Sequence, residues 1–256
     1  GNATTSKSSI ELDVASTDVA DTLRAFNYRD LITGKRANAH ATLTWPGGVD
    51  DDLLGRSSGT VQIEMFDGQL LSVNPGGAGR MLGLLSIGAL PRRLSLDFSD
   101  VTEKGFSFDK IHADFQFVDG DAFTNNLLLS GPQAEVGIVG RTGFGKRDYD
   151  QTAVVAGDIG GSLSVAGAVV GGPVLGAAVL AFSRLFKEPL KGVTRRYYRI
   201  SGPWENPSVD RIDRQEARQE NAEAAAAAAV SGSEHESTEN TESAAPNVKA
   251  PPPRAE

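Results

Sequence analysis

Cysteine is absent from this chain of 256 residues. Its absence excludes disulfide bonds and thiolate chemistry, and it leaves histidine and carboxylate side chains as the only strong metal ligands. A protein without cysteine is compatible with a reducing or an oxidising compartment, so this feature does not assign the chain to either one.

Basic residues are also in short supply: 25 lysines and arginines face 33 acidic residues, which gives a formal net charge of −8. A nucleic-acid-binding domain needs a basic footprint, so the composition argues against a nucleic acid partner. Hydrophobic residues reach only 39%, and glycine contributes 29 residues. This combination is typical of exposed β-structure with a solvated tail. No methionine or signal peptide opens the sequence, and we expect the chain to be a fragment of a longer protein.

No long apolar run is free of helix breakers. Residues 159–183 carry no charge and could span a bilayer by length alone, but glycines and Pro173 interrupt them. We predict instead a helix from Pro173 to about Lys187, because proline is favoured in the first turn of a helix.

Three short motifs resemble catalytic or cofactor sites, and each lacks the context that its chemistry needs. Residues 140–146 nearly match a phosphate-binding loop, but Arg147 replaces the magnesium ligand and a strand pattern follows. Residues 55–59 match a nucleophile elbow, yet a strand follows the serine where a helix is required. Residues 77–79 form half of a dinucleotide fingerprint without the preceding parallel strand. We therefore predict no enzyme, no catalytic residue and no cofactor.

Metal binding is not predicted either. The three histidines, His40, His112 and His235, lie far apart in the sequence. Residues 50–52 are three consecutive aspartates, which do not reproduce the alternating ligand spacing of a calcium loop.

Alternation of apolar and polar residues dominates the chain and predicts a mainly β (α+β) fold, an antiparallel sheet with short helices. Strands are expected at residues 10–14, 32–45, 94–98, 106–117, 122–130, 133–141, 149–156 and 195–201. Residues 60–73 read as a hairpin that turns at Asp67-Gly68. Helices are expected at residues 18–27 and 79–87, besides the one that Pro173 begins.

The strongest alternation lies at the centre of the chain, where aromatic residues recur on one face of the predicted strands. It has two interpretations, an ordinary closed core and an apolar surface that is open to a ligand. Five residues carry it: Phe106, Phe108, Ile111, Phe115 and Phe117.

A second surface feature follows the glycine-rich run. The predicted helix has one apolar face, and basic residues follow it closely, an arrangement that suits contact with an anionic membrane surface. The alternative is a helix packed against the sheet with a solvated basic rim. The residues concerned are Val174, Val179, Phe182, Phe186, Lys187, Lys191, Arg195 and Arg196.

Composition changes near residue 211. Acidic residues, a run of alanines and three consecutive prolines follow, which is typical of a solvated segment. We therefore divide the chain into a β domain at residues 1–210 and a disordered acidic, alanine-rich tail at residues 211–256, with a transient helix possible around residues 216–230.

A family resemblance accompanies these patterns. Residues 82–109 read LGLLSIGALPRRLSLDFSDVTEKGFSFD, and further motifs are Leu43-Thr44-Trp45-Pro46-Gly47, Gly171-Gly172-Pro173, Tyr198 and Gly202-Pro203-Trp204-Glu205-Asn206-Pro207. In their order and spacing, over roughly residues 43–209, these motifs resemble the C-terminal block of the AsmA-like envelope proteins, specifically the YhdP branch.

The resemblance implies a segment of a protein that an N-terminal helix anchors in the bacterial inner membrane. Such proteins cross the periplasm as a twisted β-sheet curled into a groove and are implicated in moving phospholipid to the outer membrane. The five central apolar residues would then line the groove for acyl chains, and the glycine-rich helix would meet the membrane at the distal end. The alternative is an envelope scaffold or assembly factor that binds a protein partner through this helix.

Overall fold

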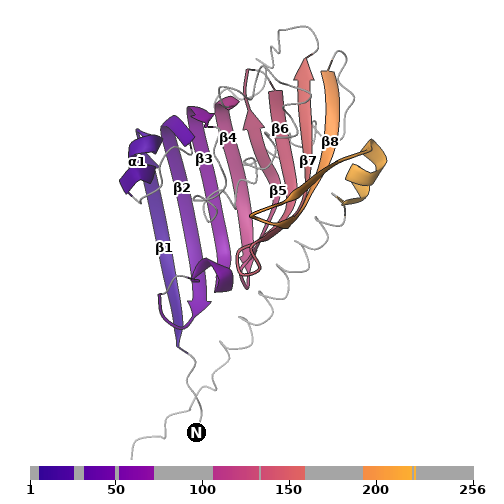
Figure 1. The fold of residues 1–256 in the computed structure, drawn as a ribbon. Helices are drawn as coiled ribbons and strands as arrows, with labels where there is room; N and C mark the ends of the chain where they lie inside the picture. The colour runs from indigo at the N-terminus through magenta and orange to yellow at the C-terminus, as the bar shows by residue number, and fades with distance from the viewer. Residues whose placement is uncertain are drawn as a thin grey trace, which may run out of the picture.

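Nine β-strands pair in the order in which the chain presents them, so the computed structural model contains one antiparallel meander (Figure 1). It describes residues 6–25, 32–49, 52–71, 106–132, 134–158, 193–220 and 222. The strands are β1 (Lys7–Ser16), β2 (Ile32–Pro46), β3 (Ser58–Leu70), β4 (Phe106–Val118), β5 (Asp121–Ser130), β6 (Ala134–Gly143), β7 (Asp148–Asp158), β8 (Val193–Pro203) and β9 (Ser208–Ile212). The predicted fold class, mainly β with an antiparallel sheet, is confirmed.

The sheet is twisted and open (Figure 1). Among the described strands β1 pairs only with β2 and β9 only with β8, so the two edges do not meet. The turns between β2 and β3, β4 and β5, β6 and β7, and β8 and β9 all lie at one end of the sheet, which we call the turn end. Helix α1 (Val19–Ala25) lies at the other end, after β1.

Helix α1 forms within the range predicted for it, residues 18–27. Asp18 accepts a hydrogen bond from the backbone N–H of Asp21 at 3.0 Å, which satisfies one of the free donors of the first turn. Val19 is buried, and Leu23 packs against the same core. The methyl groups of Val19 lie above Gly34 of β2, where a Cβ atom would come within 3.0 Å of them.

The hairpin predicted at Asp67-Gly68 is wrong, because β3 runs through both residues. Gly68 pairs with Gly34 on one side and with Phe108 on the other. Asp67 takes the left-handed conformation that suits a turn (φ 51°), but the register on each side of it is the same. A Cβ atom on Gly68 would lie 2.4 Å from the Phe108 ring, so the glycine serves close packing within the sheet.

The end of the sheet also differs from the expectation. The strand predicted at residues 195–201 exists as β8, but it is not the last one, because β9 pairs with it from Ser208. Residues 214–220 are helical, and Asp213 caps this C-terminal helix by accepting hydrogen bonds from the N–H groups of Gln215 and Glu216. Packed structure thus extends past the boundary expected at residue 210. The helices expected at residues 79–87 and 173–187, and the strand at residues 94–98, lie outside the described residues.

Candidate functional site: the apolar face of the sheet

One face of the sheet carries apolar side chains on all nine strands. Residues that pair across an antiparallel ladder point to the same side, so the register assigns each side chain to a face. One such row runs from Ala37 through Met65, Ile111, Leu129 and Val136 to Val155. We call this side the apolar face. Its members in the described strands include Ile10, Leu12, Val14, Ala37, Ala39, Ala41, Leu43, Val61, Ile63, Met65, Ile111, Ala113, Phe115, Phe117, Leu129, Val136, Ile138, Ala153, Val155, Tyr198, Ile200 and Val209.

Exposure of the apolar face changes from strand to strand. On the edge strand β1, Ile10 and Leu12 are 43% and 47% exposed. Ile63 and Met65 of β3 are half-buried, and the face is buried from β4 onward. The accessible part of the apolar face is therefore its β1–β3 portion.

All five predicted groove residues belong to the apolar face and to one hydrophobic cluster. Phe106 is half-buried, while Phe108, Ile111, Phe115 and Phe117 are each at most 2% exposed. Asp114 and Gln116 alternate with Phe115 and Phe117 along β4 and lie on the opposite face, as the period of two predicts.

The alternation changes phase within β3 and β4, and the backbone explains why. Met65 and Leu70 belong to the same cluster although one has an odd and the other an even number. Asp67, which has a left-handed backbone conformation, lies between these two residues of β3. On the neighbouring strand β4, the alternation breaks at the same level, between Phe108 and Ile111. One residue outside the β region of φ/ψ space lets both halves of the strand present apolar side chains to the same side.

Aromatic rings close the turn end of the apolar face. The ring of Phe144, in the β6–β7 turn, lies 5.4 Å from that of Phe117 on β4 and 5.3 Å, edge-on, from that of Trp204 after β8. Backbone hydrogen bonds join the turns themselves: Gly120 donates to Ser57 and Phe144 donates to Gly120. The strands are thereby drawn together at this end.

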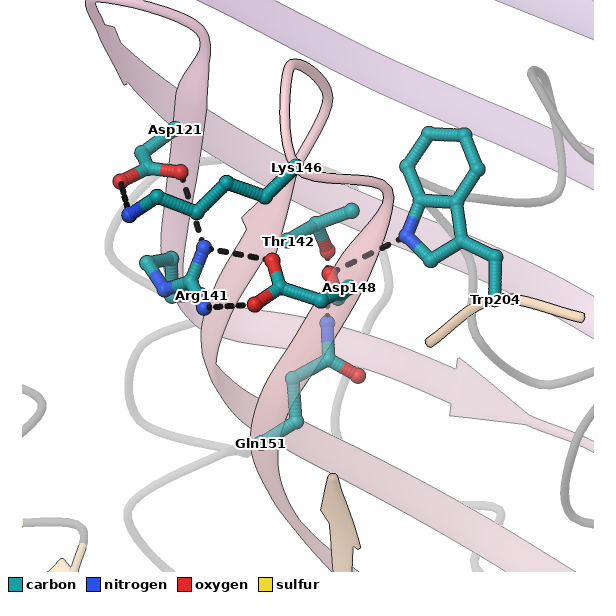
Figure 2. Close-up of polar contacts among 7 residues, drawn as sticks. All are labelled: Asp121, Arg141, Thr142, Lys146, Asp148, Gln151 and Trp204. Atoms are coloured by element: carbon teal, nitrogen blue, oxygen red, sulfur yellow. Dashed lines mark hydrogen bonds and ion pairs between the residues drawn. The ribbon is translucent and has the colours of Figure 1, made fainter. Parts of the chain in front are cut away.

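A polar clamp supports the same turns from the other face (Figure 2). Arg141 of β6 donates to both carboxylate oxygens of Asp148 and, at 2.8 Å, to Asp121 of β5. These carboxylates raise the pKa of Arg141, with the hydrogen bond to Asp148 as the largest cause, although burial opposes the shift. The indole N–H of Trp204 donates to the backbone carbonyl of Asp148 at 3.0 Å. The clamp therefore connects β5, β6 and β7 to the end of β8.

The opposite side, which we call the polar face, is divided into two parts. From β5 to β9 it carries an apolar cluster beneath the C-terminal helix, whose Ala217 is fully buried against Leu128, Val139, Val154 and Tyr197, beside charged side chains such as those of the clamp. From β1 to β4 it carries a row of polar side chains, Asp13, His40, Gln62 and Asp114, which pair across the strands in that order.

Of the eight predicted membrane-contact residues, the structure describes two. Arg195 pairs with Ala156, whose cluster lies on the polar face, whereas Arg196 pairs with Val155 on the apolar face. The two arginines therefore point to opposite sides of β8. Arg195 lies near Glu135, whose pKa is raised by burial and partly restored by the charge of Arg195. Val174, Val179, Phe182, Phe186, Lys187 and Lys191 lie outside the described residues.

Sequence reasoning missed the clamp around Arg141 and the aromatic contacts of Phe144. The sequence contains the turn at residues 140–147 and the motif at Trp204. The spacing of these residues, however, does not reveal that β4, β6 and β8 meet there.

In the described residues no helix is long and apolar enough to cross a membrane. Nor do those residues bring three or more histidine or carboxylate side chains together in an arrangement that would hold a metal ion.

Comparison with known proteins assigns the family. The family model described as YhdP protein matches residues 1–209. The chain is 35% identical over 158 residues to the intermembrane phospholipid transporter YhdP of Escherichia coli (strain K12), an alignment that covers 62% of this chain and 12% of that protein. The chain thus spans a small part of this relative's length, and no solved structure matches it significantly. Because the family model covers most of the chain, and the residues it covers form the open antiparallel sheet described above, the chain belongs to the YhdP family.

Proposed function

We propose that this chain is a segment of a lipid-transfer protein of the bacterial envelope, and that its apolar face shields phospholipid acyl chains on their way across the periplasm to the outer membrane. The observation that carries the proposal is the continuity of the apolar face over nine strands of an open sheet. A transport role also agrees with the name of the relative, an intermembrane phospholipid transporter.

The physical argument rests on the accessible β1–β3 portion. Shielding a methylene group from water contributes ~0.8 kcal/mol, so a few side chains suffice to hold an acyl chain. Leu12 and Ile10 are exposed on the edge strand, and they pair with Ala41 and Leu43 of β2. The next alanine of β2 on this face, Ala39, pairs with the half-buried Ile63 of β3. The charged headgroup would stay in water beside the sheet.

The five groove residues would then act as the continuation of this surface beneath the bound lipid. Phe106, Phe108, Ile111, Phe115 and Phe117 adjoin the accessible strands and keep the apolar character unbroken. Their burial makes them a support for the face, while β1 to β3 make first contact with the acyl chain.

Membrane contact at the distal end belongs to the same proposal. It rests on the sequence of residues 173–191, where an apolar helical pattern precedes Lys187 and Lys191. Changing Lys187 and Lys191 together to glutamate should reduce binding to vesicles that contain anionic lipid. If the variant binds these vesicles as well as the unaltered chain does, and salt does not weaken the binding, the proposed membrane contact is wrong. Anchoring of the parent protein in the inner membrane is proposed on the resemblance alone.

Two neighbouring residues of β1 offer a matched test. Leu12 lies on the apolar face and Asp13 on the polar face, and both are exposed. A photoreactive phenylalanine analogue at position 12 should crosslink to phospholipid in cells, and the same analogue at position 13 should not. Mass spectrometry of the crosslinked protein identifies the lipid. Equal crosslinking at both positions, or none at position 12, would overturn the proposal.

A further inference from the structure

Buried polar atoms without a hydrogen-bond partner gather at one place on the polar face. Four such side-chain atoms in the described residues belong to Glu64, His112 and Asp114. Buried polar groups in folded proteins almost always have partners, so a group of exceptions needs a physical explanation.

His112 is the centre of this group. It is 5% exposed, and its ring nitrogens Nδ1 and Nε2 lie 3.5 Å from Glu64 Oε1 and Asp114 Oδ2 respectively. These separations are too long for ordinary hydrogen bonds. Glu64 Oε1 has an ion-pair partner, because Lys110 Nζ lies 2.8 Å away. The ring nitrogens of His112 thus meet the two carboxylates only in long contacts, and Oδ1 of Asp114 has no hydrogen-bond partner.

Asp114 is held in place from the other side. Asn126 donates to its Oδ2 at 2.6 Å and accepts from its backbone N–H at 2.9 Å. The register shift in β5, between Thr124 and Leu127, is what brings Asn126 across to β4. With Oδ2 engaged, Oδ1 is the oxygen of Asp114 that can accept a further hydrogen bond.

Glu64, His112 and Asp114 are among the residues that line a depression in the polar face between β1 and β4. Its volume is about 390 Å³, which is enough for a small organic molecule. The polar side chains around it are Asp13, Asn38, His40, Gln62, Glu64, His112 and Asp114. Three of them are carboxylates, of which Glu64 pairs with Lys110 and Asp13 with His40.

The chemistry of the lining favours a cation that carries N–H donors. A primary ammonium group has three donors and no acceptor, so it can satisfy the free acceptor Asp114 Oδ1 and, when His112 is neutral, the acceptor nitrogen of its ring. A metal ion fits less well, because the described carboxylates and imidazoles are not grouped as metal ligands. We propose that the depression on the polar face binds a protonated primary amine, which donates hydrogen bonds to Asp114 and His112.

The site lies on the opposite side of the sheet from the apolar face, so this proposal does not rest on the proposed function. Two sources of the amine share the chemistry: a free amine such as ethanolamine, and the aminoethyl headgroup of a phospholipid. Glycerophosphoethanolamine carries that headgroup without acyl chains and distinguishes them. Tighter binding of glycerophosphoethanolamine than of ethanolamine supports the headgroup as the source, and equal binding supports the free amine.

A titration of the whole chain followed by NMR tests the proposal. Ethanolamine at neutral pH and constant ionic strength should shift the ring C–H resonances of His112 and His40 in a saturable way. Choline has the same charge but no N–H donor and should produce no saturable shift. Asp114→Asn, which keeps the shape of the side chain, should weaken ethanolamine binding at least about tenfold. Asp210→Asn, at an exposed carboxylate on β9, should leave it unchanged.

Three results would overturn the proposal: no saturable shift with either amine, equal shifts with choline, or equal affinity in Asp114→Asn. If Asp114→Asn fails to fold, the comparison of ethanolamine with choline on the unaltered chain decides by itself. If the amine-binding proposal fails in this way, the crosslinking test at position 12 still decides the proposed lipid-transfer function independently.

Discussion

Arg141 and Asp148 form a two-pronged ion pair, in which Nη1 and Nη2 of the guanidinium each lie 2.9 Å from a separate carboxylate oxygen (Figure 2). The pair joins β6 to β7 just before their turn, and Asp121 of β5 adds a third bond to the same guanidinium. Both partners are mostly buried, with exposed side-chain fractions of 18% and 29%. Planar guanidinium groups suit this geometry, which fixes direction as well as distance.

Replacing Arg141 with methionine should lower the free energy of unfolding by roughly 2–4 kcal/mol, because two carboxylates would lose their shared cation. Urea denaturation followed by circular dichroism measures the change. Lys146→Met is the matched control. Lys146 is 70% exposed and lies 3.8 Å from Asp121, so its loss should cost less than ~0.5 kcal/mol. Equal effects would show that the clamp adds no stability.

Trp204 should stabilise the folded protein more through its ring contacts than through its hydrogen bond. Trp204→Phe removes the donor to Asp148 and should cost about 1 kcal/mol. Trp204→Ala also removes the contacts with Phe144 and Tyr149 and should cost about 3–5 kcal/mol. Thermal and urea midpoints of the two variants separate these effects. A Trp204→Phe variant as unstable as Trp204→Ala would contradict this order.

The C-terminal helix should stabilise the sheet although it follows the expected domain boundary. Ala217→Asp places a charge against the buried Leu128, Val154 and Tyr197, and we expect a loss of at least about 2 kcal/mol. Gln219→Asp puts the same charge on an exposed position of the same helix and should be near neutral. Comparable stability of both variants would mean that the helix does not dock in solution.

Stability in acid should depend on Asp114. His112 lowers the pKa of Asp114 below its usual 3.8, Asn126 adds to this, and burial opposes both. A carboxylate with a depressed folded-state pKa contributes stability above its unfolded pKa and loses it as the pH falls through the folded pKa. The free energy of unfolding should therefore decline between about pH 5 and pH 2, and less steeply in Asp114→Asn. Identical slopes in urea titrations of both proteins would contradict the linkage.

The strands could be predicted from the sequence because their signal is local. Ile111, Phe115 and Phe117 alternate with Asp114 and Gln116, and only an extended chain with two different faces matches that period. The N-cap of α1 at Asp18 is local in the same way. The break in alternation between Phe108 and Ile111 was also visible, although its cause, the left-handed residue opposite it in β3, was not.

The hairpin at Asp67-Gly68 could not be judged from the sequence. An Asp-Gly pair suits a turn, and Asp67 does adopt the turn-like conformation. Whether the chain then reverses depends on strands β2 and β4, which occupy both sides of β3 and place Gly34 and Phe108, 34 and 40 residues away, beside Gly68. The feature that decided this point is long-range pairing, which no window of neighbouring residues contains.

The sequence by itself determined that this protein is a β-sheet with one apolar side, because alternation acts over neighbouring residues. Tertiary structure alone decided which groups meet across the sheet: Arg195 and Arg196 on opposite sides, Phe144 against Trp204, and His112 between Glu64 and Asp114. The physical reason is that register and strand order bring together residues that are distant in the chain. A slip of one residue would exchange the two faces of a strand, so only the folded sheet fixes these contacts.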